Sequence, residues 1–108
     1  MYLVHARLLP GPGAVLPADA AVLVQQCAGP VDGVEFVVCH PAAPGGPVLG
    51  LFLLAPSLAE AEQAAERVCR RALSRHVPLR AFALLACGAV MAPAYYEKLL
   101  EESGDPPR

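Results

Sequence analysis

Ionisable side chains recur in three segments of this chain whose apolar pattern is typical of β-strands. His5 and Arg7 lie in the first segment, Glu35 in the second and Arg80 in the last. Neighbouring side chains of a strand point to opposite faces, so residues of one parity gather on one face of a sheet. If the apolar parity of the first strand faces a layer of helices, the other parity lies on the open face. The residues expected on this open face are His5, Arg7, Glu35, Cys39 and Arg80.

These residue types suit the polar end of an otherwise apolar pocket. An imidazole titrates near neutral pH, so His5 is the candidate catalytic residue that moves a proton. The guanidinium groups of Arg7 and Arg80 can pair with a carboxylate or an enolate oxygen, and together with Glu35 they form the predicted ligand-binding set. The alternative is structural: Glu35 forms a salt bridge with one of the arginines, and His5 is hydrogen-bonded in an interface.

Cysteine and glycine patterns predict no second site. Cys39 precedes His40, but adjacent strand residues point apart, so the two are not expected to form a thiol–imidazole pair. The four cysteines show no CxxC pair and no zinc-like spacing with a histidine, and free thiols are expected. Gly11 and Gly13 belong to no phosphate-binding motif. We therefore predict neither a metal nor a cofactor.

The elements that position these residues follow from apolar periodicity. The clearest is a helix from Ser57 to His76, which begins with the capping-box spacing of Ser57 and Glu60 and carries an apolar stripe on one side. A shorter helix is expected at about 18–27, and a last one from Pro93 to about Glu102. The expected strands are residues 2–9, 33–40, 48–54 and 79–87.

This order predicts an α+β, ferredoxin-like βαββαβ fold, with a four-stranded antiparallel sheet, two helices on one face and a short C-terminal helix. Residues 1–103 are expected to form a single domain, with a disordered tail at 104–108. The strand at 48–54 is apolar on both faces, so the open face needs a cover. A second copy of the chain is the simplest cover, and we expect a homodimer or another even-numbered oligomer.

The chain resembles the dimeric α/β-barrel superfamily, which includes muconolactone isomerases, YCII-like proteins and antibiotic-biosynthesis monooxygenases. The resemblance rests on size, element order and the opening strand Met1-Tyr2-Leu3-Val4, and it covers most of the chain without a diagnostic motif. It implies two sheets packed face to face around a cavity for a small organic molecule, often without a cofactor. It assigns no catalytic residue to this chain.

Composition excludes several classes of partner. The formal net charge of −2 and a pI near 5.8 provide no basic surface for nucleic acid. No apolar run is long enough for a membrane span, and Met1–Leu9 lacks the pattern of a signal peptide. We therefore expect a cytoplasmic protein that binds neither nucleic acid nor membranes.

Two functions follow from these expectations. The first is a small-molecule-binding protein or cofactor-independent enzyme of the dimeric α/β-barrel kind, acting on a small and possibly anionic organic substrate. The alternative is a non-catalytic oligomeric interaction module that assembles through its sheet and its last helix. A cavity bordered by His5, Arg7 and Arg80 would favour the first function, and a dry interface between sheets would favour the second.

Overall fold

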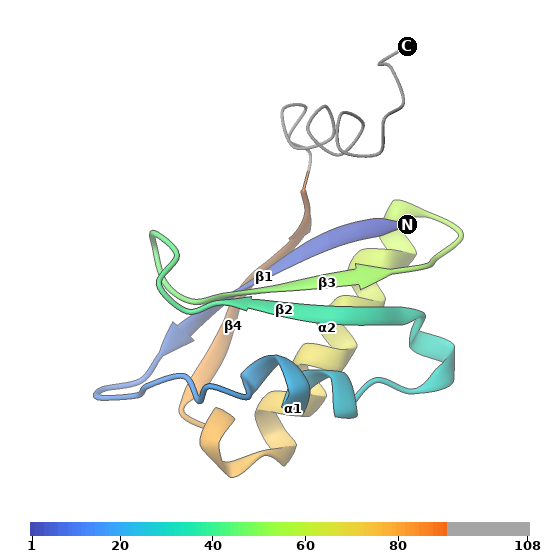
Figure 1. The fold of residues 1–108 in the computed structure, drawn as a ribbon. Helices are drawn as coiled ribbons and strands as arrows, with labels where there is room; N and C mark the ends of the chain where they lie inside the picture. Colours follow the sequence, from blue (N-terminus) through green and yellow to red (C-terminus); the bar gives the residue numbers. More distant parts are fainter. Residues whose placement is uncertain (91–108) are drawn as a thin grey trace.

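The computed structural model describes residues 1–90, which form one antiparallel sheet and two α-helices (Figure 1). The elements in chain order are β1 (Tyr2–Pro10), α1 (Ala20–Gln26), η1 (Pro30–Asp32), β2 (Val34–His40), β3 (Val48–Leu53), α2 (Leu58–Arg75), η2 (Val77–Leu79) and β4 (Phe82–Ala89), where η marks a short 3₁₀ helix. The expected α+β class and antiparallel four-stranded sheet are confirmed. The expected helix from Pro93 and the tail at 104–108 lie outside the described residues.

The sheet has the strand order β2-β3-β1-β4, and every neighbouring pair is antiparallel. β1 and β2 therefore run in the same direction with β3 between them, and α1 connects them. Likewise β3 and β4 run in the same direction with β1 between them, and α2 connects them. The two β-α-β units are interleaved, so residues 1–90 form one sheet rather than two.

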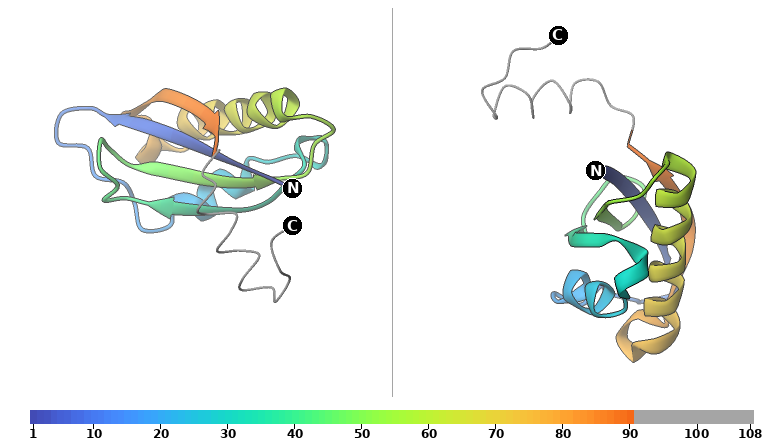
Figure 2. Two further views of the ribbon diagram at one scale, coloured as in Figure 1. Left: turned by 90° about the horizontal axis from the view of Figure 1, so that it is seen from above. Right: turned by 90° about the vertical axis from the view of Figure 1, so that its right-hand side faces the viewer.

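Both helices pack on one face of this sheet, and the right-hand view of Figure 2 shows α2 running along one side of the strands. Val24 of α1 and Val68 of α2 belong to one buried cluster with Val4, Ala6 and Leu8 of β1. This parity of β1 therefore faces the helices, which was the condition for placing the other parity on the open face. Each fully buried Val or Leu side chain contributes about 1.5–3 kcal/mol to folding, so this layer is the main source of stability.

The long helix α2 begins where the sequence predicts. The Ser57 hydroxyl oxygen accepts a hydrogen bond from the Glu60 backbone N–H (3.2 Å), as a capping residue does. The Glu60 carboxylate accepts from the Ser57 hydroxyl (3.0 Å) instead of from the Ser57 backbone, so only half of the predicted reciprocal capping box forms.

Two departures from the expected elements have local causes. Residues 77–79 form the 3₁₀ turn η2 around Pro78, so β4 starts at Phe82 and not at Leu79. β4 also contains a register shift, opposite the step from Arg7 to Leu8 of β1, which interrupts the alternation of its side chains.

A buried carboxylate, which the sequence did not predict, ties the turn η1 to α2. The Asp32 side chain is 1% exposed and accepts hydrogen bonds from Arg67 Nη2 and Arg71 Nη1, both at 3.2 Å. It also accepts from the Gly29 backbone N–H at 2.7 Å. Burial alone would raise the pKa of Asp32, but the Gly29 N–H and the two guanidinium groups outweigh it and lower that pKa.

Candidate functional site

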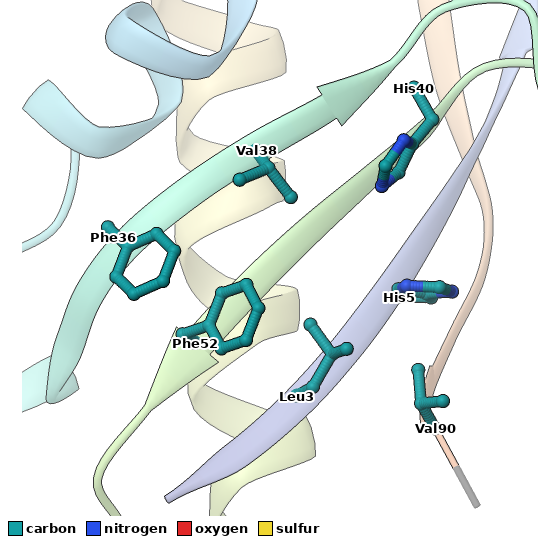
Figure 3. Close-up of a pocket in the computed structure, with 7 residues that line it drawn as sticks. All are labelled: Leu3, His5, Phe36, Val38, His40, Phe52 and Val90. Carbon is teal, nitrogen blue, oxygen red and sulfur yellow. The ribbon is translucent and has the colours of Figure 1, made fainter. Parts of the chain in front are cut away.

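The open face of the sheet carries a hollow of about 420 Å³, seen in close-up in Figure 3. Its walls are formed by residues of β1, β2 and β3 and by the residue that follows β4. The lining residues are Leu3, His5, Phe36, Val38, His40, Phe52 and Val90. Volume and lining both fall within the range of small-molecule sites, which are mostly apolar with a few polar groups.

Two glycines flank His5 in the sheet. His5 is paired with Gly50 of β3 on one side and with Gly88 of β4 on the other. A Cβ atom on Gly50 would lie 2.9 Å from Val38 Cγ2, whereas a Cβ atom on Gly88 would have no heavy atom within 4 Å. The imidazole of His5 therefore has no side chain beside it at the paired position of either neighbouring strand.

The hollow has an aromatic end and an imidazole end. The rings of Phe36 and Phe52 stack with their centroids 4.2 Å apart and their planes at 16°. The rings of His5 and His40 meet edge to face, 6.2 Å between centroids and at 61°. Figure 3 shows the two pairs at opposite ends, with apolar side chains between them.

The surroundings of His5 keep it neutral at pH 7. Partial burial lowers the pKa of His5 below the usual 6.5, and the positive charges of His40 and Arg7 lower it further. Of the described residues that line the hollow, none is acidic. A neutral imidazole can accept a proton on one ring nitrogen and donate a hydrogen bond from the other, so His5 is equipped for general base chemistry or for polar recognition.

Of the predicted site residues, the structure places only His5 in the wall of the hollow. Arg7 lies on the same face, as predicted, but its Nη1 donates to the backbone oxygens of Pro44 (2.7 Å) and Gly46 (3.3 Å). Arg7 thereby holds the loop between β2 and β3 and acts on His5 through its charge.

Glu35 and Cys39 are not part of the hollow. Glu35 is exposed in the register shift between Val34 and Phe36, and its backbone oxygen accepts from Gln25 Nε2 (3.2 Å). Cys39 packs against the core on the helix side of the sheet, where burial raises the pKa of its thiol. Its predicted place on the open face is wrong.

Arg80 is also misplaced by the sequence argument. It precedes β4, and its Nε donates to the Ser74 backbone oxygen (3.1 Å) at the end of α2. Within residues 1–90 no ion pair joins Glu35 to an arginine, so the described part of the chain does not contain the salt bridge considered as an alternative.

His40 is the residue that the sequence argument missed. On β2 the parity of Phe36, Val38 and His40 faces the open side, whereas the prediction put Glu35 and Cys39 there. Both parities of this strand are apolar, so apolarity alone could not decide between them. The alternation groups His40 with Phe36 and Val38, but it does not say which face of the sheet this group occupies.

Comparison with known proteins gives no relative from which a role could be transferred. No known protein family, no curated protein and no solved structure matches this chain. Among residues 1–90, no helix has the length and apolarity needed to cross a bilayer. In the same part of the chain, no three His, Cys, Asp or Glu side chains gather as metal ligands would.

Proposed function

We propose that this protein binds a small organic molecule in the hollow on the open face of its sheet. The observation that carries this proposal is the composition of the walls: five apolar side chains line an open hollow with two imidazoles at one end. Apolar area supplies binding energy, and a few polar groups fix the orientation of the ligand. We propose His5 as the residue that accepts a proton from the bound molecule, which is the catalytic extension of this binding role.

We further propose that a second copy of the chain covers the open face, in the manner of the dimeric α/β-barrel superfamily. The interleaved β-α-β units and the helices confined to one face support a ferredoxin-like assignment. Leu3, Phe36, Val38 and Phe52 make the other face apolar, whereas an antiparallel sheet that faces water on one side usually has a polar outer face. A face-to-face dimer would bury the exposed parts of Phe36, Val38 and Phe52 and close the hollow.

One observation favours an interaction module as the second candidate. Phe36 is 43% exposed and stacked on Phe52, and aromatic side chains of this kind often lie at the centre of protein interfaces. In that case the dimer partner or another protein would fill the hollow, and no small molecule would bind there.

The test is a small-compound binding screen on the purified full chain, followed by a variant that fills the hollow. Gly88→Val adds a side chain beside His5, where a Cβ atom meets nothing within 4 Å, and valine suits a strand. Ala83→Val is the matched control, because it adds bulk to the same strand at an exposed position outside the hollow.

We expect compounds that bind the wild type and Ala83→Val to bind Gly88→Val at least about tenfold more weakly, a loss of about 1.4 kcal/mol. Circular dichroism checks that both variants are folded. Compounds that bind all three proteins equally would place the site elsewhere, and a screen without binders would favour the interaction module.

A further inference from the structure

We infer that the ligand is a flat aromatic molecule with an anionic oxygen at one end, such as an aryl carboxylate or a phenolate. The inference rests on the proposed function and specifies the class of molecule that the hollow accepts. It follows from the separation of the stacked phenylalanines from the paired imidazoles, with apolar side chains between them (Figure 3).

The aromatic end favours a flat ring. Phe36 and Phe52 lie nearly parallel on neighbouring strands and form one wall, and the exposed part of Phe36 is available to a ligand. Aromatic pairs contribute about 0.5–1.5 kcal/mol beyond the burial of their area, so a ring should bind about two- to tenfold better than its saturated analogue. Leu3 and Val38 line the middle of the hollow without adding a polar group.

The imidazole end favours a negative charge. The titratable and charged groups that face His5 are His40 from β2 and Arg7 from its own strand, while β3 and β4 present Gly50 and Gly88. Every ionisable group in this set is a base. A bound cation would meet only repulsion here, whereas an oxyanion can accept hydrogen bonds from imidazole N–H groups and stabilise their protonated forms.

This arrangement predicts how the affinity for an anionic ligand changes with pH. A bound anion raises the pKa of His5, so the complex takes up a proton and binding strengthens as the pH falls. Because His5 starts with a lowered pKa, the gain appears as the pH falls from 8 towards 5.5, where a carboxylate, with a usual pKa of about 4, is still ionised. An uncharged ligand should show no comparable gain.

The experiment compares matched probes by isothermal titration calorimetry. The probes are 2-naphthoate, its uncharged amide 2-naphthamide, its saturated analogue decahydro-2-naphthoate, the cation 2-naphthylmethylammonium, and 4-nitrophenolate as the phenolate. We expect the order naphthoate, then amide, then cation, with about tenfold between acid and amide at pH 6, since hydrogen bonds to charged groups are about twice as strong as neutral ones. The ratio of naphthoate to nitrophenolate affinity, measured at pH 8, shows whether the hollow prefers a carboxylate or a phenolate.

Two variants assign the effects to the two ends of the hollow. His40→Gln should reduce the acid-to-amide ratio towards one, and Phe52→Leu should reduce the ratio of aromatic to saturated acid. Because each readout is a ratio measured on one protein, a general loss of folding or affinity cancels. Circular dichroism of each variant provides the check on folding.

The outcomes separate this inference from the proposed function. If the amide binds as tightly as the acid, the inferred charge is wrong, and if the saturated acid binds as tightly as the aromatic one, the inferred ring is wrong. If no probe binds, but an unrelated compound binds the wild type and not Gly88→Val, the inferred ligand class is wrong and the proposed binding site is supported. If Gly88→Val weakens no compound that binds, the proposed function itself fails.

Discussion

At the scale of single residues, the properties of His5 come from its neighbours rather than from its position in the sequence. Its cross-strand partners are glycines, so it lies beside empty space, and its charged neighbours are basic. Partial burial of the ring and its basic neighbours disfavour the imidazolium form. The folded protein thus holds a neutral imidazole at pH 7, and it loses stability as the pH falls below the ordinary value of 6.5, because the unfolded chain then binds the proton more readily.

Removing a neighbouring positive charge should raise the pKa of His5. We expect His40→Gln and Arg7→Gln each to shift the NMR titration of the His5 ring to higher pH, because each removes a charge that opposes protonation. Arg80→Gln is the control, since Arg80 bonds to Ser74 and is not among the groups that act on His5. A shift as large in Arg80→Gln as in Arg7→Gln would contradict this account.

The carboxylate of Asp32 should be a main contributor to stability. Asp32→Ala leaves the Gly29 N–H and Arg67 Nη2 without this acceptor, and Arg71 keeps only its bond to the Cys27 backbone oxygen. A lost buried partner costs about 1–3 kcal/mol in the free energy of unfolding. Because the pKa of Asp32 is lowered in the folded state, its contribution is present above the ordinary 3.8 and is lost as the pH falls through the folded value.

Urea denaturation at pH 7 and at pH 3 measures this effect. The control is Asp19→Ala, at an exposed cap position of α1 where the side chain forms no capping hydrogen bond, and we expect a change below about 0.5 kcal/mol. Equal losses in Asp32→Ala and Asp19→Ala would show that the buried network is unimportant.

Neither Asp32 nor His40 could be selected from the sequence alone. The importance of Asp32 depends on Arg67 and Arg71, which lie 35 and 39 residues away. His40 reaches the vicinity of His5 only through the pairing of β1 and β2 with β3, which no local pattern of the sequence specifies. His5 was predictable because the alternation within a single strand fixes its face.

At the scale of elements, local patterns sufficed for helices and strands but not for irregularities. The apolar stripe and the capping residue located α2 to within a residue at each end. The register shifts in β2 and β4 have no comparable pattern, because a bulge is decided by pairing with another strand. As a result the sequence predicted which segments are strands, but it assigned the wrong faces to β2 and misplaced the start of β4.

The turn from η1 into β2 should tolerate only glycine at position 33. Gly33 does not line the hollow. Its φ is 72°, and a Cβ atom there would lie 2.2 Å from the Leu54 backbone oxygen. We expect Gly33→Ala to destabilise the fold by more than the roughly 1–2 kcal/mol that positive φ alone costs a side chain. Thermal unfolding followed by circular dichroism measures the difference.

Gly13 provides the matched control for this prediction. Its φ of 71° is nearly the same, but a Cβ atom there meets nothing within 4 Å. Gly13→Ala therefore reports the conformational penalty without the clash. Equal destabilisation by the two substitutions would mean that the contact with Leu54 is relieved at no cost.

At the scale of the whole molecule, the helices and the hollow lie on opposite faces of one thin sheet. The helix face is sealed by a cluster of fully buried side chains, whereas the open face has apolar walls around an unfilled space. If a second copy covers that face, the same apolar surface serves both assembly and ligand binding. The oligomeric state and the ligand affinity should then depend on each other.

A charge on the open face should separate the copies. We expect the wild type to sediment as a dimer or another even-numbered oligomer, and Phe36→Asp to weaken that assembly by at least about tenfold, because it buries an unpaired carboxylate among apolar side chains. Val77→Asp is the control, since Val77 is 70% exposed in the turn η2 and does not line the hollow.

Analytical ultracentrifugation across a range of protein concentrations measures the assembly, and ligand binding is measured at the same concentrations. Dilution of the wild type should weaken ligand binding in step with dissociation, because each separated copy leaves its hollow open to water. A wild-type monomer at high concentration, or equal effects of Phe36→Asp and Val77→Asp, would contradict the face-to-face dimer. If a monomer still binds ligands at full affinity, the hollow remains the proposed binding site, but the second copy has no part in it.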